Sequence, residues 1–319
     1  MVRVGNKNVI FTKIVMVESF FCLQYHLYID VKGGIIMDNK NKVPEYLYHY
    51  TNIESLAMIL KNKSIRFNSL CNLDDKLEDK INDLTTFGRF VFISSWTSID
   101  KEVIPMWNMY TDMKAGVRIK VKKNPFLTYF SKENVKGSTK FTANLFDGGT
   151  FEFDFTDLII SPSEFLNTTN YSLVSPNGNT ILHEVIYTED KDLLIPHIYK
   201  SDFSHENIET MKLGKYKRTC WDFQKEWRYI LYFSPISFKE MSELKSNSVE
   251  EIIKRSADPL YCLPFSGYPL EINQDAFNDM SITMSPKLSD GNKEILYLLK
   301  DKYNPNMEIY ESDLCDTVK

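Results

Sequence analysis

Hydrophobic and polar positions over residues 45–70 follow two periods that predict a strand, a helix and a second strand. Tyrosines fill every second position over residues 46–50, which is typical of a strand. Apolar residues over residues 53–60 fall at helical spacing and form one stripe. Thr51 with Glu54 three residues later is a capping box, which predicts that the helix begins at Thr51. Alternation then resumes and predicts the second strand.

The same periods predict the elements that follow. They indicate strands over residues 90–96, 117–121, 184–188 and 226–233, a short helix opening at Pro105, a hairpin over residues 140–155 with its turn at residues 147–149, and a helix over residues 208–220. Strands joined by hairpins as well as by helices predict an α+β fold with mixed or antiparallel sheets and flanking helices. No repeat or linker composition follows Met37, so one globular domain over residues 37–319 is the simplest organisation.

Residues 1–36 call for a different explanation. Charged residues such as Glu18 interrupt the apolar stretches, which rules against a membrane span and against a signal peptide. The codons of Lys32 to Gly34 can contain a ribosome-binding sequence at the correct distance from Met37. We therefore predict that residues 1–36 are a leader translated from upstream DNA and not part of the fold.

Composition limits the classes of function. A chain of 319 residues with 43% hydrophobic and 25% charged residues has the composition of a soluble globular protein. A net charge of -5 gives no general electrostatic footprint for duplex nucleic acid. Five scattered cysteines without a C-x-x-C pair favour the cytoplasm, and five histidines without close ligand spacing give no metal site. We expect no membrane association, and the oligomeric state stays open.

His49 is the candidate that stands out. It lies at the end of the first predicted strand, just ahead of a predicted helix N-terminus, and such a position attracts anions. The common catalytic signatures are absent, including a glycine-rich phosphate loop, a nucleophile elbow and H-E-x-x-H.

Four blocks in a fixed order carry a family resemblance. They are EYLYHYT at residues 45–51, PMWNMY at 105–110, GVRI at 116–119 and WDFQKEWR at 221–228. In this order the chain resembles the bacterial domain of unknown function 2971 family from Tyr46 to about Tyr303. Where that family has Asn-Asp-Pro-x-Glu, this chain has Asp74-Asp75-Lys76-Leu77-Glu78, for which we predict a solvated turn, with a site role for Asp74, Asp75 and Glu78 as the alternative.

A more distant resemblance suggests an activity. His49-Tyr50-Thr51, followed by a helix and a strand, is similar to the first motif of the ADP-ribosyltransferase superfamily. The resemblance implies an ADP-ribosyltransferase-like core and NAD as co-substrate. It implies that His49 anchors the ribose and Tyr110 stacks on nicotinamide. It further implies that Glu226 is the catalytic glutamate and that Thr51 and Arg228 belong to the cofactor site.

The implied chemistry sets a geometric requirement. A carboxylate that accepts a hydrogen bond from the ribose 2'-hydroxyl stabilises oxocarbenium charge as nicotinamide leaves. His49 and Glu226 must therefore converge on one cleft. The expected protein is an NAD-consuming enzyme of the toxin or phage-defence kind, with a protein or a nucleic acid as acceptor.

Each candidate also has a structural interpretation. His49 can be a hydrogen-bonded strand-end histidine, and Glu226 with Arg228 can form a structural ion pair on one strand face. Trp107 and Tyr110 suit a core, and we also expect Trp221 and Trp227 to be core residues. The alternative function is then a non-catalytic intracellular interaction or ligand-binding module.

Overall fold

The computed structural model describes residues 43–129, 140–144, 150–154, 157–161, 164, 168–174, 181–201, 206–244 and 247–317. The predicted leader and the predicted hairpin turn at residues 147–149 lie outside these ranges. Within them, the hairpin is present as β5 (Lys140–Asn144) paired antiparallel with β6 (Thr150–Asp154).

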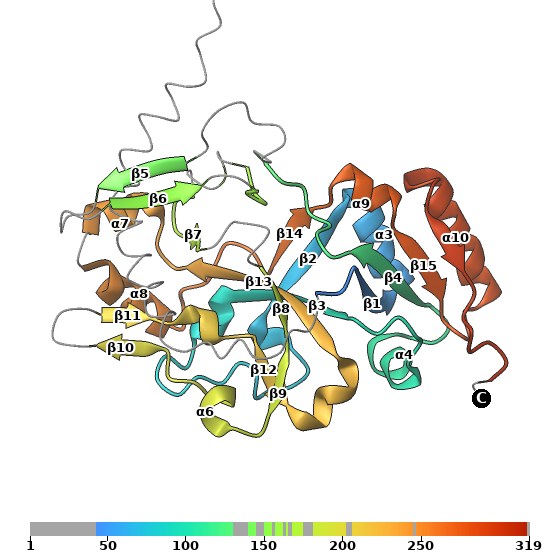
Figure 1. Ribbon diagram of the computed structural model, residues 1–319, viewed down its shortest axis with the longest axis horizontal. Coiled ribbons are helices and arrows are strands. Elements are labelled where there is room, and N and C mark those ends of the chain that lie inside the picture. Colours follow the sequence, from blue (N-terminus) through green and yellow to red (C-terminus); the bar gives the residue numbers. More distant parts are fainter. Residues whose placement is uncertain are drawn as a thin grey trace, which may run out of the picture.

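A large sheet organises the described part of the chain (Figure 1). Its order is β14-β2-β3-β1-β4-β15-β16, and β13 pairs with β3 and with the short strands β7 and β8. The bounds are β1 (Tyr46–Asn52), β2 (Ser64–Ser69), β3 (Val91–Thr97), β4 (Gly116–Lys122), β7 (Ser172–Leu173), β8 (Leu182–Glu184), β13 (Glu226–Ser234), β14 (Gly267–Glu271), β15 (Ser281–Met284) and β16 (Glu308–Tyr310). All of these pairings are antiparallel except that of β15 with β16.

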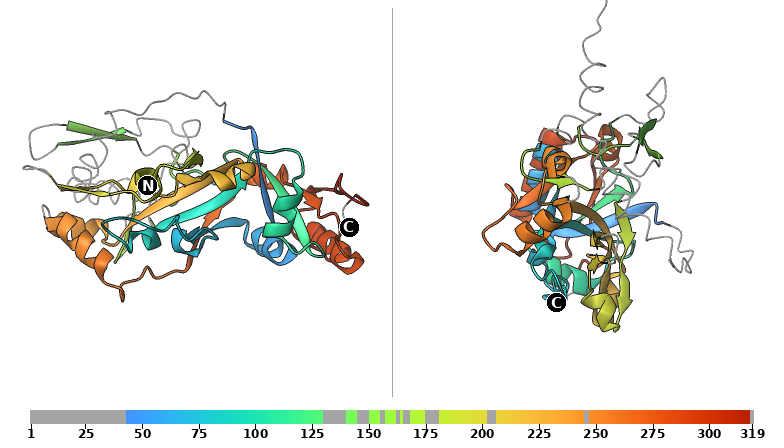
Figure 2. Two further views of the ribbon diagram at one scale, coloured as in Figure 1. Left: turned by 90° about the horizontal axis from the view of Figure 1, so that it is seen from below. Right: turned by 90° about the vertical axis from the view of Figure 1, so that its left-hand side faces the viewer.

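Helices flank this sheet at both ends, with α3 and α10 at one end and α7 and α8 at the other (Figure 2). The described helices are α3 (Ile53–Asn62), α4 (Ile104–Tyr110), α6 (Lys191–Leu194), α7 (Phe238–Leu244), α8 (Ser248–Ala257), α9 (Gln274–Asn278) and α10 (Asp290–Tyr303). Two small strand pairs, β9 (Ile186–Thr188) with β12 (Tyr216–Arg218) and β10 (Tyr199–Ser201) with β11 (Glu206–Ile208), lie apart from the sheet. The architecture confirms the predicted α+β class.

The predicted start of the first helix is wrong by one residue. Thr51 still belongs to β1, and Asn52 caps α3 by accepting a hydrogen bond from the Ser55 N–H over 2.8 Å. Asparagine is among the best N-cap residues, so its side chain takes the role that we expected of Thr51.

The predicted helix over residues 208–220 is also wrong. The segment forms a 3₁₀ turn at Thr210–Lys212, the strand β12 and a second 3₁₀ segment at Thr219–Gln224. Gly214 has a φ of 77°, which a helix cannot accommodate, and β12 pairs in parallel with β9. Tertiary pairing overrides the local pattern here. The predicted strand over residues 184–188 is likewise divided into β8 and β9.

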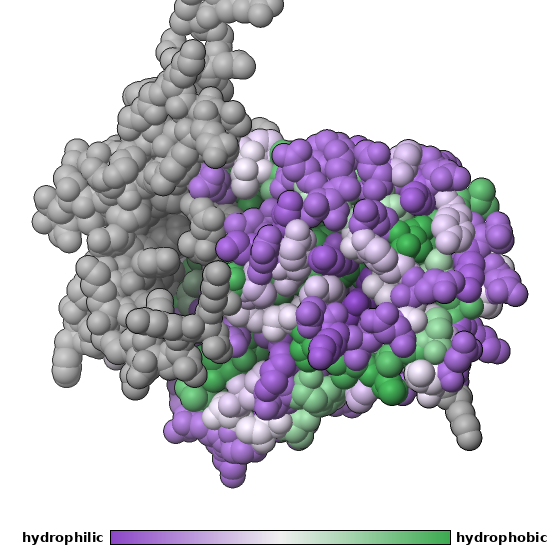
Figure 3. Space-filling model, turned by 45° about the vertical axis from the view of Figure 1, so that its right-hand side comes forward, coloured by the Kyte–Doolittle hydropathy of each residue, from purple (hydrophilic) through white to green (hydrophobic). Residues whose placement is uncertain are grey.

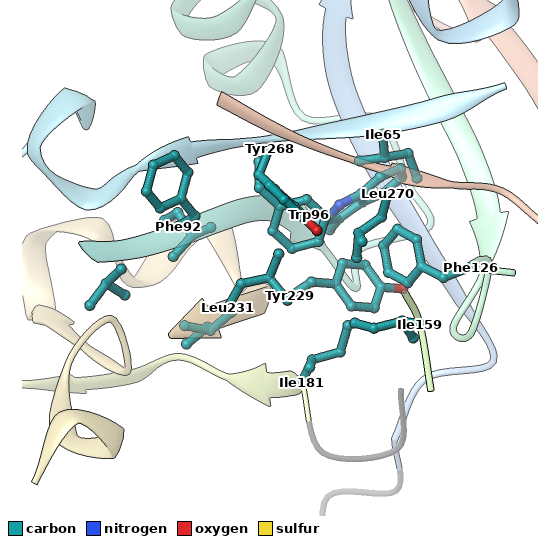
Figure 4. Close-up of a cluster of buried hydrophobic side chains, with 14 of the residues drawn as sticks. Ile65, Phe92, Trp96, Phe126, Ile159, Ile181, Tyr229, Leu231, Tyr268 and Leu270 are labelled. Atoms are coloured by element: carbon teal, nitrogen blue, oxygen red, sulfur yellow. The ribbon is translucent and has the colours of Figure 1, made fainter. Parts of the chain in front are cut away.

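A cluster of buried hydrophobic side chains packs on one face of the sheet (Figure 4). Trp96 on β3 and Tyr229 on β13 point to this side, and the Tyr229 ring lies 4.9 Å from that of Phe126. Each large apolar side chain buried in this way contributes about 1.5–3 kcal/mol. Because side chains alternate along a strand, Glu226, Arg228 and their neighbours on β3 point to the opposite side.

Candidate functional site

The site is a notch in the sheet, because β1 and β2 pair with different parts of the same edge of β3. Tyr48 on β1 is opposite Thr97, whereas Asn68 on β2 is opposite Ile93. Residues 94–96 of β3 therefore have no register partner on either strand, and α3 joins β1 to β2 across the gap. A cavity of about 890 Å³ occupies this notch.

All five residues selected from the sequence line this cavity. They are His49, Thr51, Tyr110, Glu226 and Arg228, and they come from β1, α4 and β13. The lining also includes polar residues that sequence reasoning did not select. The most informative of these are Arg66, Asn68, Glu78, Lys217 and Gln224.

His49 is fixed by the free edge of β3. Its Nδ1 lies 2.8 Å from the carbonyl oxygen of Ser95, which can only accept, so Nδ1 carries the proton. In the neutral ring Nε2 is then an acceptor. Burial lowers the pKa of His49, which favours this neutral form at pH 7.

His49 and Glu226 lie on opposite faces of the sheet, so the expected convergence from one face is contradicted and the two residues meet only at the edges of the notch. Tyr48, Thr97 and Glu226 are register partners in one row, so they share a face. His49 is the next residue along β1, and its ring packs against Trp96 at 5.1 Å, on the core side. The cavity borders both residues because it occupies the notch at the strand edges.

The predicted anion site at the N-terminus of α3 has few donors left. The N–H of Ile53 donates to the Ala115 carbonyl over 2.9 Å, and the N–H of Ser55 donates to Asn52 Oδ1 over 2.8 Å. These two bonds satisfy groups that would otherwise attract an anion.

Four buried charges form the floor of the cavity. Arg228 Nε and Nη2 bind the Glu226 carboxylate at 2.6 Å and 3.1 Å. Lys217 Nζ lies 3.0 Å from Glu226 Oε2 and 3.4 Å from Glu78 Oε1, and Arg228 also binds Glu78. Two cations and two carboxylates thus compensate one another, as a buried group of charges requires.

The pKa of Glu226 follows from these contacts. Burial alone would raise the pKa of this carboxyl, but Arg228 and Lys217 hold it well below its usual range. Glu226 is therefore ionised at neutral pH. The structural ion pair that we considered as an alternative for Glu226 and Arg228 is present.

The predicted solvated turn at residues 74–78 is wrong, since Asp75 and Glu78 are both buried. Asp75 binds Arg218 Nε and Nη2 at 3.1 Å and 3.0 Å and accepts from Trp221 Nε1 at 2.9 Å. These bonds fix the loop to the segment that carries Lys217. The only sequence signal for it was the acidic block at residues 74–78, which departs from the pattern of the resembling family by lacking its proline.

The aromatic residues that line the cavity are Tyr48, Tyr50, Trp96 and Tyr110. Tyr110 Oη lies 2.5 Å from Gln224 Nε2, and burial together with the charge of Glu226 raises the pKa of this tyrosine. Trp107 is fully buried, as a core residue should be. Trp227 is also core, but Trp221 is only half-buried and its ring lies over Lys217 Nζ at 4.8 Å.

Within the described ranges, no group of three or more His, Cys, Asp or Glu side chains is placed to hold a metal ion. No helix in these ranges is both long and apolar enough to cross a membrane. In the coloured part of the face in Figure 3, hydrophilic residues cover most of the surface, with hydrophobic residues among them.

The family comparison supports part of the sequence resemblance. Residues 106–229 match the family described as Protein of unknown function (DUF2971). The matched segment contains Tyr110, Glu226 and Arg228, and β1 with His49 and Thr51 precedes it. No curated protein and no solved structure matches the chain.

Proposed function

We propose that the protein is an NAD-consuming ADP-ribosyltransferase-like enzyme and that NAD binds in the notch cavity. One observation carries the proposal. The same cavity is lined by three residues that motifs selected from segments far apart in the sequence, namely His49, Tyr110 and Glu226. A large cavity with convergent polar groups is the usual form of a small-molecule site.

Each residue has a role that fits its surroundings. The unprotonated Nε2 of His49 accepts a hydrogen bond from a ribose hydroxyl. Tyr110 presents its ring to the nicotinamide, and its hydrogen bond to Gln224 limits rotation of that ring. Thr51 shapes the wall beside His49.

Glu226 supplies the negative charge. As the bond between ribose C1' and the nicotinamide nitrogen breaks, nicotinamide leaves with the electron pair and positive charge develops on the ribose. An ionised carboxylate stabilises that charge, and Arg228 holds the carboxylate in position. A nucleophile on a protein or a nucleic acid then bonds to C1' and loses its proton. A cytoplasmic location is part of this proposal, and the four described cysteines are free, as suits a reducing compartment.

Release of nicotinamide tests the proposal. Purified protein is incubated with NAD, alone and with cell extract, and free nicotinamide and labelled products are measured. We expect release with wild type and a loss with Tyr110→Ala. Tyr297→Ala is the matched control, since Tyr297 is exposed on α10 and does not line the cavity. Absence of release from folded wild type under both conditions would overturn the proposal.

A second candidate is a non-catalytic ligand-binding module. The observation in its favour is that both oxygens of the Glu226 carboxylate already accept hydrogen bonds from Arg228 or Lys217. A carboxylate whose two oxygens are already hydrogen-bonded suits a rigid ligand-binding site as well as a catalytic site. The two candidates separate in one assay, because a module binds its ligand without releasing nicotinamide from NAD.

A further inference from the structure

Arg66 lies across a glycine on the neighbouring strand. Arg66 on β2 is opposite Pro269 on β14, and Gly267 is diagonal to it. A Cβ atom added at Gly267 would lie 2.1 Å from Arg66 Nε and 2.6 Å from Cζ. The guanidinium can occupy this position only because residue 267 has no side chain.

The guanidinium keeps most of its hydrogen-bonding capacity. Its Nη2 donates to Ser266 Oγ over 3.1 Å, and within the described part of the chain Arg66 forms no ion pair. A guanidinium has five N–H donors. Several of them therefore remain for another partner.

Among the basic side chains of the described cavity lining, Arg66 is the one without an ion pair, and the lining also contains the exposed carboxylates of Glu54 and Asp74. The described lining contains two other basic residues, Lys217 and Arg228, and both are paired with Glu78 and Glu226. Arg66 and Asn68 alternate on one face of β2, and Asn68 is opposite Ile93 on β3. Register thus places Arg66 on the same side of the sheet as Glu226.

We infer that Arg66, seated on Gly267, is an anion-binding subsite that takes the phosphate groups of a nucleotide. The planar fork of a guanidinium matches phosphate oxygens and binds them through two parallel hydrogen bonds. The N-terminus of α3 has already used its Ile53 and Ser55 donors, so Arg66 is the better anion partner in this cavity. The identity of the nucleotide as NAD rests on the proposed function, but the subsite does not.

Ligands with and without phosphate groups test the subsite. Binding of NAD, ADP-ribose, inorganic pyrophosphate and nicotinamide riboside is measured by calorimetry on wild type and on Arg66→Gln. We expect the substitution to lower the affinity for NAD, ADP-ribose and pyrophosphate about tenfold or more, because each ligand loses charge-assisted hydrogen bonds to its phosphate groups. Nicotinamide riboside, which has no phosphate, should bind both proteins equally. Lys61→Gln is the matched control, because Lys61 lies in the last turn of α3 and does not line the cavity.

A second pair of variants tests the glycine. Gly267→Ala should displace the Arg66 guanidinium and lower the affinity for NAD in the same way. A Cβ atom added at Gly291 meets nothing within 4 Å, so Gly291→Ala should leave the affinity for NAD unchanged. Melting temperatures verify that each variant is folded.

The outcomes separate the two proposals. Equal binding of NAD to wild type and Arg66→Gln would overturn the subsite and leave the proposed function standing. Failure of NAD to bind wild type would overturn the function. In that case, pyrophosphate binding that depends on Arg66 would support the anion-binding subsite without the proposed function. Absence of pyrophosphate binding would overturn the subsite as well.

Discussion

Glu226 and Arg228, two positions apart on β13, form a two-point ion pair with contacts of 2.6 Å and 3.1 Å. Both side chains are almost completely buried. The residue that the proposed function needs as a transition-state carboxylate is therefore also part of the structure. A substitution at Glu226 has to be judged on stability before it is judged on turnover.

We expect Glu226→Gln to destabilise the fold. Breaking one partner of a buried pair costs about 3–5 kcal/mol, and the lower end applies because Glu78 still compensates Arg228. Denaturant unfolding measures the change. Glu243→Gln, in the exposed pair with Lys239, is the control, and its free energy of unfolding should stay within about 0.5 kcal/mol of the wild-type value. Equal stability of Glu226→Gln and wild type would contradict the role of the pair.

The same variant has a predicted pH dependence. The folded pKa of Glu226 lies below its unfolded value of about 4.3, so the pair stabilises the protein above that pH. This stability is lost as the pH falls through the folded pKa. The stability gap between wild type and Glu226→Gln should be constant from about pH 7 to pH 5 and narrow in stronger acid. A gap that widens in acid would refute the direction of the shift.

Asp75 should matter for the cavity although it does not line it. Asp75→Asn removes the charge that binds Arg218, and we expect a loss of about 2 kcal/mol and weaker NAD binding as the loop shifts Glu78. Thermal unfolding and calorimetry measure both effects. Asp279→Asn, which disrupts a surface pair with Lys122, should change the stability and the NAD affinity little. An effect of equal size in the two variants would argue against the loop anchor.

Tyr110 distinguishes ring stacking from hydrogen bonding. If the ring stacks on nicotinamide, Tyr110→Phe should retain NAD affinity and Tyr110→Ala should weaken it by about 2- to 10-fold. Both variants lose the hydroxyl that contacts Gln224, so the comparison isolates the ring. If Phe weakens binding as much as Ala does, the hydroxyl carries the interaction and the stacking role is wrong.

Strands were predictable from sequence because their period is local. Alternation located β1 and β4, and the apolar and aromatic run after Glu226 located β13. The helix expected over residues 208–220 failed because pairing of β12 with β9 is a tertiary event that leaves no periodic signal. The same reason explains the missed site residues. Lys217 reaches the cavity on β12, and Glu78 arrives on a loop held by Arg218.

His49, by contrast, was selected from a predicted place at a strand end. That placement is wrong, because β1 continues to Asn52 and leaves His49 in its middle, but the structure does put His49 at the cavity. The sequence could not reveal that β1 and β2 leave part of one edge of β3 open, since register depends on the whole sheet. Nor could it reveal that Gly267 makes room for Arg66, because the two residues are 201 positions apart and meet only by pairing of β2 with β14.

Calorimetric titration of wild type and His49→Ala with NAD tests the central claim most directly. The account predicts saturable binding by wild type, with affinity weakened about 2- to 10-fold by the substitution, because one hydrogen bond to Nε2 is lost. Since burial lowers the pKa of His49 from its ordinary value of about 6.5, wild-type affinity should be constant at pH 7 and above and fall only in acid, as the ring becomes protonated below that ordinary value. No binding by folded wild type, or identical affinity of the two proteins, would contradict the account.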